Sequence, residues 1–133
     1  MKLVATLLCL ALSTFAGTPA GAEERAHCNL AVLTQADRER AHQVYPLLRD
    51  AIQERKELAD GYAYRFPATA LKEVGDWVAI EAKCCQPLSY EISVGPLPGG
   101  VVWVRITGHE AKEFIDAEFA RISEKVATRG NAK

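Results

Sequence analysis

Apolar residues recur at helical spacing in a first stretch that runs from Gln35 to about Gln53. Thr34 is a favourable N-cap, and Asp37 three residues later can accept hydrogen bonds from the first-turn amides. Pro46 lies inside the stretch, where a proline removes a hydrogen bond and clashes with the preceding turn. We therefore expect a kinked helix or two shorter helices. Its apolar positions are Ala41, Val44, Leu48, Ala51 and Ile52.

Two further stretches have the same helical period. Thr69 is the expected cap of the second, which runs to about Cys84, before Pro87. The third is expected from about Glu110 to Val126. The second stretch aligns Leu71, Val74, Val78 and Cys85, with Trp77, Ile80 and Cys84 beside them. The third aligns Ala111, Ile115, Phe119, Ile122 and Val126.

Between these stretches the apolar residues alternate, which is typical of strands. Asp60-Gly61 is a turn signal, followed by alternating aromatic residues from Tyr62 to Phe66. A second alternating run from Leu88 to Val94 is joined through GPLPGG to a returning strand, Val101 to Thr107. We interpret the aromatic stripe as a sheet face covered by helices, with an aromatic binding platform as the alternative.

The expected order of elements is helix, hairpin, helix, hairpin, helix, or α-ββ-α-ββ-α. Antiparallel pairs with helices on one face are typical of an α+β domain. The prediction is therefore two antiparallel hairpins that form one sheet packed against two or three helices. No internal repeat of solenoid length is present.

The first 22 residues have the pattern of a secretory signal peptide. Lys2 is followed by an apolar run to about Ala16 and by small residues that end at Ala22. The apolar run is shorter than the ~20 residues that cross a bilayer. We expect residues 1–22 to be removed and residues 23–133 to form a single domain, ordered over about 28–127. The mature protein is predicted to be periplasmic or secreted; an uncleaved anchor is the alternative.

The charged residues do not favour a polyanionic partner. The chain has 16 basic and 17 acidic residues, mixed along its length. Nucleic acid and anionic membranes are therefore excluded as expected partners, and no second apolar run is long enough to span a membrane. A small ion or an unknown protein is the expected partner. No nucleophile elbow, phosphate loop, dinucleotide fingerprint or H-E-x-x-H motif is present.

The cysteines carry the strongest chemical signal. Without Cys9, which lies in the predicted signal peptide, Cys28, Cys84 and Cys85 remain. An odd number of cysteines cannot all pair within one exported chain. Glu81, Cys84 and Cys85 stand at i, i+3 and i+4, so a helix would present them on one side.

If the entry segment around Cys28 folds back over the end of this helix, three sulfur atoms form one site. Thiolates are soft ligands that suit Zn(II), Cu(I), Hg(II) or As(III). Glu81 would be a further ligand or a hydrogen-bond acceptor, and His27 and His109 are candidate additional ligands. The spacing is not a zinc signature, since no C-x2-C pair is present.

Two other interpretations of the cysteines remain open. A disulfide from Cys28 to Cys84 or Cys85 would give a stapled interaction module without catalysis. Alternatively, Cys84 or Cys85 attacks and Cys28 resolves in a thiol-disulfide oxidoreductase. The nearby carboxylate of Glu81 opposes the depressed thiol pKa that such an enzyme needs. Binding of a soft metal ion or metalloid is the leading hypothesis.

The stretches WVAIEAKCCQPLSYEI and VWVRITGHEAKEFI resemble a family of small bacterial proteins with no assigned activity. The family pattern is similar to W-x3-E-x2-C-C-P-x-L-x-[FY]-x-[LIV], and the chain departs from it at Gln86, which separates Cys85 from the proline. The resemblance covers nearly all of residues 23–133 and implies that Cys28, Glu81, Cys84 and Cys85 belong to one constellation. The matching residues are Cys28, Asn29, Leu30, Asp60, Gly61, Tyr62, Tyr64, Trp77, Glu81, Cys84, Cys85, Gly108, Lys112, Glu113 and Phe114.

Overall fold

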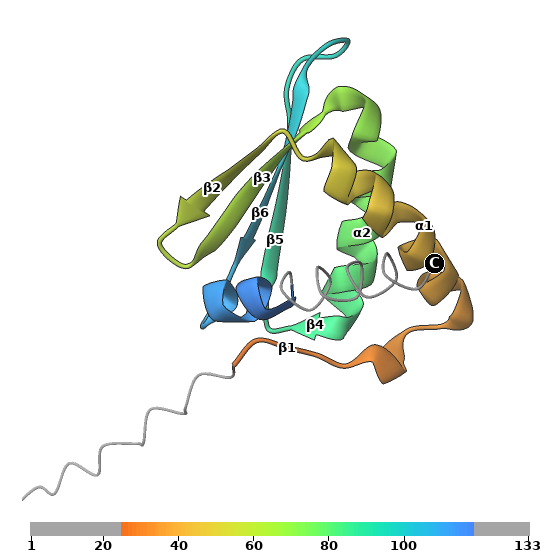
Figure 1. The fold of residues 1–133 in the computed structure, drawn as a ribbon, viewed down its shortest axis with the longest axis vertical. Helices are drawn as coiled ribbons and strands as arrows, with labels where there is room; N and C mark the ends of the chain where they lie inside the picture. The colour runs from red at the N-terminus through yellow and green to blue at the C-terminus, as the bar shows by residue number, and fades with distance from the viewer. Residues whose placement is uncertain (1–24, 119–133) are drawn as a thin grey trace, which may run out of the picture.

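The structure is a computed structural model that describes residues 25–118. Two helices, α1 and α2, lie on one side of a four-stranded antiparallel sheet, as Figure 1 shows. This arrangement confirms the predicted α+β class and the alternation of helices and hairpins. The elements are β1 (His27–Cys28), a 3₁₀ turn (Leu30–Val32), α1 (Gln35–Ala51), β2 (Glu54–Leu58), β3 (Gly61–Pro67), a second 3₁₀ turn (Ala68–Ala70), α2 (Leu71–Cys84), β4 (Cys85–Gln86), β5 (Ser89–Val94), β6 (Val101–Thr107) and a helix over residues 111–118.

Helix α1 begins at the predicted cap. The hydroxyl of Thr34 accepts a hydrogen bond from the amide of Asp37, and the Asp37 carboxylate accepts one from the amide of Thr34. The alternative of two shorter helices divided at Pro46 is wrong, because α1 continues through it to Ala51. Pro46 lies on the exposed face of the helix, so the carbonyl that loses its partner there faces water.

Helix α2 ends at Cys84 as predicted, but its expected cap is wrong. Ala70 occupies the N-cap position, and Thr69 lies in the preceding 3₁₀ turn. In that turn the amide of Leu71 donates to the carbonyl of Ala68. Backbone bonds of this tighter turn replace the side-chain cap that the sequence suggested.

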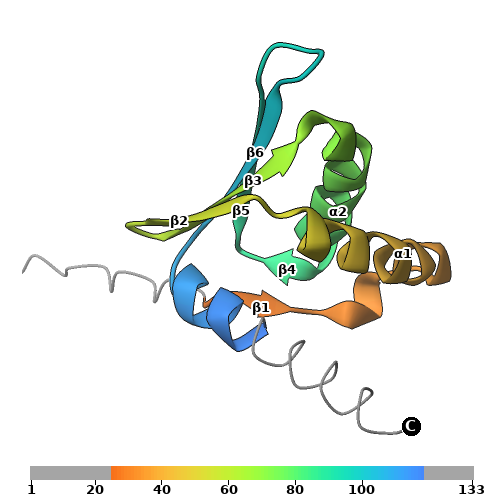
Figure 2. The same cartoon turned by 45° about the horizontal axis from the view of Figure 1, so that its top comes forward.

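The sheet has the strand order β2-β3-β6-β5. Across its centre, Tyr62 faces Ile106, Tyr64 faces Val104 and Phe66 faces Val102, all of them buried. The aromatic stripe is therefore a core face covered by helices, as predicted. Figure 2, in which the sheet is seen more nearly edge-on, shows α1 and α2 together on that side.

The third predicted helix is described only in part. Ala111 and Ile115 pack into the core as expected, whereas Phe119, Ile122 and Val126 lie outside the described residues, as does the predicted signal peptide. Between residues 25 and 118, no helix combines the length and the apolar character needed to cross a membrane.

Candidate functional site

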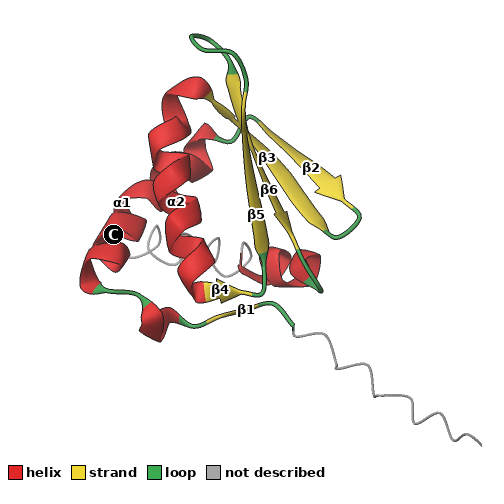
Figure 3. Ribbon diagram, turned by 180° about the vertical axis from the view of Figure 1, so that it is seen from behind, coloured by secondary structure: helices red, strands yellow, loops and turns green. Residues whose placement is uncertain are grey.

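The amino-terminal segment folds back onto the end of α2. Strand β1 pairs antiparallel with β4, with Cys28 opposite Cys85, and the amide of Asn29 donates to the carbonyl of Cys84 over 2.7 Å. Figure 3 shows the two short strands side by side below the helix. The expectation that Cys28 reaches the adjacent cysteines is therefore confirmed.

Cys28 and Cys85 form a disulfide across this pair of strands. Their α-carbons are 4.0 Å apart, although 57 positions separate them along the chain. Cys84 is a free thiol, and both Cys84 and Cys85 are only 2% exposed. The predicted staple is therefore present, with one buried free thiol beside it.

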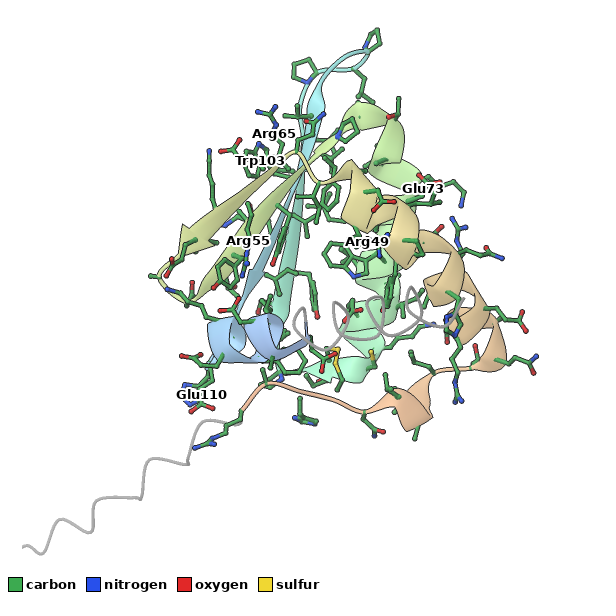
Figure 4. All side chains as sticks on the ribbon, viewed as in Figure 1. Arg49, Arg55, Arg65, Glu73, Trp103 and Glu110 are labelled. Carbon is green, nitrogen blue, oxygen red and sulfur yellow. A yellow bond between two sulfur atoms is a disulfide. The ribbon has the colours of Figure 1, made fainter. Side chains whose placement is uncertain are left out.

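Glu81 completes the group, one helical turn before Cys84. Its Oε2 lies 2.9 Å from Sγ of Cys85, and the Sγ atoms of Cys84 and Cys85 are 3.5 Å apart. One ligand atom from each of Cys28, Glu81, Cys84 and Cys85 can be chosen so that all four lie within 4.8 Å of one another. We call these four residues the cysteine cluster; its sulfur atoms are drawn in yellow at the lower end of α2 in Figure 4.

The backbone explains why the two adjacent cysteines diverge. Cys84 is the last residue of α2, and Cys85 caps the helix, where its amide donates to the carbonyl of Glu81. Cys85 then enters β4 with an extended backbone. Glu81 and Cys84 therefore approach from the helix, and Cys85 approaches from β4, which pairs with the strand β1 that carries Cys28.

Burial dominates the electrostatics of Glu81. Loss of water raises the pKa of this carboxyl, and hydrogen bonds from Tyr45 and Trp77 only partly oppose that effect. The hydroxyl of Tyr45 donates to Oε1 of Glu81. Because Cys85 has no thiol proton in the disulfide, a hydrogen bond across the 2.9 Å contact requires that the proton lie on Glu81.

The Cys84 thiol is held in its protonated form. Burial first, and the Glu81 carboxyl second, raise the pKa of Cys84 to about 11. The other side chains with a charge effect on this thiol, Asp37 and Glu118, are also acidic and also raise its pKa. A nucleophilic cysteine needs the opposite environment.

Neither candidate histidine belongs to the cluster. The ring of His27 is directed to the backbone, with Nδ1 3.1 Å from the carbonyl of Arg25. His109 lines a polar hollow with Asp60, Glu110 and Lys112. Among residues 25–118, the metal-binding geometry joins Cys28, Glu81, Cys84 and Cys85 without them.

The aromatic side chains that line the cluster could not be predicted from the sequence. Tyr45 comes from α1, and burial followed by the Glu81 charge raises its pKa well above the ordinary range. Tyr90 comes from β5 and has a pKa raised by the same two causes. Tyr45 directly follows the core residue Val44, but its partner lies 36 positions away on α2. Only the packing of α1 on α2 reveals the contact.

Comparison with known proteins identifies no relative: no family model, no curated protein and no solved structure matches the chain.

Proposed function

We propose that this chain is an exported protein that captures a soft metal or metalloid ion with Cys28, Cys84 and Cys85. Glu81 acts as a fourth ligand or as a hydrogen-bonding neighbour of the ion. The observation that carries the proposal is the convergence of three sulfur atoms and one carboxylate within 4.8 Å in a buried place. Three thiolates in one place favour a thiophilic ion over a hard one.

The separation of one pair of sulfur atoms, those of Cys84 and Cys85, is close to that of two ligands of one ion. Metal–thiolate bonds of ~2.3 Å in tetrahedral geometry separate neighbouring sulfur atoms by roughly 3.8 Å. The sulfur atoms of Cys84 and Cys85 are already 3.5 Å apart. A shift of a few tenths of an ångström on reduction would bring this pair to the required separation.

The charges around the site favour some soft ions over others. The carboxyl groups that raise the pKa of Cys84 are those of Glu81, Asp37 and Glu118, and Asp37 is paired with Lys83. A complex with net negative charge is costly to bury among such groups. Three thiolates around As(III) form an uncharged complex, whereas three around Zn(II) leave one negative charge. We therefore rank As(III) first among the candidate ions, before Hg(II) and Zn(II), and we rank Cu(I), whose three-thiolate complex carries two negative charges, last.

Capture requires the reduced protein. While Cys28 and Cys85 are bonded to each other, only Cys84 and Glu81 remain as ligands. A dithiol reductant must supply two electrons and two protons to convert the disulfide to two thiols, and it becomes a disulfide itself. The protein then binds the ion with release of thiol protons.

Native mass spectrometry of the folded protein tests the proposal. The full chain is reduced with a phosphine, which offers no competing thiol, and is titrated with As(III), Hg(II), Cu(I) and Zn(II). We expect one ion per chain in the reduced state and none in the oxidised state. Cys28→Ser and Cys84→Ser should each weaken binding at least tenfold, whereas the exposed His42→Ala serves as a control. Absence of a bound ion under all conditions would refute the proposal.

A disulfide-stapled module without chemistry is the second candidate, and the Cys28–Cys85 bond favours it. Thiol counting on protein trapped directly from cells distinguishes the two. One reactive thiol per unfolded chain supports a permanent staple, and three support an open site. The oxidoreductase alternative has weaker support, because the environment of Cys84 disfavours its thiolate.

A further inference from the structure

The two edges of the sheet differ in how they are protected. Strand β2 forms one edge, and four of its five residues are charged (Glu54 to Glu57). Such charges discourage pairing with another chain. Strand β5 forms the other edge, and Glu91 is its one charged residue. This edge lacks the protection that the opposite edge has.

Strand β5 is also exposed where it is apolar. Ile92 is 38% and Val94 is 44% exposed, and Leu97 in the following loop is 57% exposed. Within residues 25–118, β5 has a hydrogen-bonded partner on one side, β6, and none on the other. Unpaired backbone groups beside exposed apolar side chains are the features of a strand that accepts another strand.

We propose that β5 pairs antiparallel with β5 of a second copy of this chain, so that two four-stranded sheets become one continuous sheet. The inference is independent of the proposed metal site. In a symmetric antiparallel pair, opposed residues point to the same side of the sheet. The only possible registers are therefore those in which one residue of the strand lies opposite the same residue of the second copy.

The register centred on Ile92 is the one that the side chains favour. It places Ile92 opposite Ile92 of the second copy and Tyr90 opposite Val94, all on the side that faces the helices. Glu91 then lies opposite Ser93 on the other side. The register centred on Glu91 would instead oppose two carboxylates, which is unfavourable. Pro87 and Pro96 flank the strand, and because they lack an amide hydrogen they limit longer pairings.

Cysteine cross-linking tests this register in the full chain. Cys9→Ala and Cys84→Ala together are used as the background, so that no free thiol remains and the Cys28–Cys85 disulfide stays intact. Opposed residues in an antiparallel pair have α-carbons ~4.5–5.5 Å apart, which is within disulfide range. Ile92→Cys should therefore give a covalent dimer under mild oxidation. Ser93→Cys alone should form the covalent dimer at least tenfold more slowly than Ile92→Cys. A mixture of Ser93→Cys and Glu91→Cys chains should cross-link rapidly, because this register places the two residues opposite each other.

Analytical ultracentrifugation provides an independent measurement. The unmodified chain should show a reversible monomer–dimer equilibrium, and Ile92→Lys should raise its dissociation constant at least tenfold. Leu47→Lys is the matched control, since Leu47 is 58% exposed on α1 and away from β5. It should leave the equilibrium unchanged within twofold.

Two results would overturn the inference. The first is an unmodified chain that stays monomeric into the high micromolar range, which would also be the outcome if another part of the chain covered β5. The second is equal cross-linking of Ile92→Cys and Ser93→Cys. Because the cross-linking variants retain the strand sequence elsewhere, they keep the test valid if Ile92→Lys fails to fold.

Discussion

Glu81 links the chemistry of the cluster to the packing of its neighbours. One of its carboxyl oxygens accepts a hydrogen bond from the hydroxyl of Tyr45, and the other lies 2.9 Å from the Cys85 sulfur. Burial raises the pKa of Glu81, and the Glu81 carboxyl in turn raises the pKa of the Cys84 thiol. Burial and the acidic neighbours of Cys84 therefore keep this thiol protonated.

Alkylation of Cys84 measures this effect directly. A rise in thiol pKa from 9.0 to about 11 lowers the thiolate population at neutral pH about 100-fold, and the 2% exposure of Cys84 slows access further. We expect iodoacetamide to label the folded oxidised protein at least 100-fold more slowly than the protein in denaturant. Rapid labelling of the folded protein at pH 7 would contradict this environment and would favour the oxidoreductase alternative.

At the scale of the elements, the junction of α1 and α2 supports the cluster. The Asp37 carboxylate at the start of α1 accepts a hydrogen bond from Lys83 in the last turn of α2, with 2.7 Å between Oδ1 and Nζ. Arg40 and Asp76 form a second ion pair between the same helices. These contacts help to fix the relative position of the two helices, and hence of Tyr45 and Glu81.

The contacts of Asp37 predict how the stability of the protein changes as the pH falls. Lys83 first, then Thr34, lower the pKa of Asp37 from 3.8 to about 2. An acid whose pKa is lower in the folded state contributes stability above its unfolded pKa and loses it as pH falls through the folded pKa. We therefore expect Asp37→Asn to lower the melting temperature at pH 6 and to have progressively less effect between pH 4 and pH 2.

Thermal unfolding monitored by circular dichroism checks this dependence. Asp50→Asn, an exposed aspartate in the last turn of α1, is the matched control. A difference between the wild-type protein and Asp37→Asn that stays constant from pH 6 to pH 2 would show that the charge of Asp37 has no role.

Substitution by alanine should change the unfolding free energy in opposite directions at Gly61 and Gly75. A β-carbon at Gly61 would clash with the backbone carbonyl of Ile106, and backbone cannot move aside as a side chain can. At Gly75, inside α2, a β-carbon meets nothing within 4 Å. We expect Gly61→Ala to cost more than about 2 kcal/mol of unfolding free energy through strain and displaced packing. Gly75→Ala should add about 0.5–1 kcal/mol through helix propensity. Urea denaturation of both variants measures the two effects. A change in unfolding free energy of the same sign in both variants would contradict the described packing.

At the scale of the whole molecule, the disulfide closes the longest covalent loop among the described residues. It joins positions 57 apart and ties β1 to β4 beneath α2. In the chain-entropy model such a loop stabilises the fold by about 4 kcal/mol. This value is a large part of the stability of a small domain.

Reduction of the oxidised protein should therefore lower its unfolding free energy by about 4 kcal/mol. Denaturant unfolding with and without a phosphine reductant measures the change. If the reduced chain is too unstable to remain folded, the metal site proposed above cannot form before the ion arrives, and added As(III) should then restore cooperative unfolding. A reduced chain with unchanged stability would contradict the structural role of the bond.

Features of the fold that depend only on neighbouring residues could be predicted from the sequence. Thr34 and Asp37 give the start of α1, and Asp60-Gly61 gives the turn of the first hairpin, because each signal depends on neighbouring residues alone. Residues 54–57 are all charged and have no local strand signal, yet they lie in β2, where residues 55–57 are exposed to water. Pairing with β3 compensates for their low strand propensity.

Only part of the candidate site could be predicted from the sequence. The spacing of Glu81, Cys84 and Cys85 indicates a shared side, and the fold confirms that Cys28 reaches it. The choice of Cys85 as the disulfide partner depends on β1 pairing with β4, which begins after the helix ends. The contact of Tyr45 with Glu81 depends on helix packing over 36 positions. Neither feature has a local signal.

X-ray absorption spectroscopy of the reduced protein loaded with As(III) tests the three-sulfur site, because it counts the sulfur atoms bound to the ion. We expect three sulfur neighbours in the wild-type protein, and two in each of Cys28→Ser, Cys84→Ser and Cys85→Ser. Two or fewer sulfur neighbours in the wild-type protein, or a count unchanged by these substitutions, would contradict the three-sulfur site.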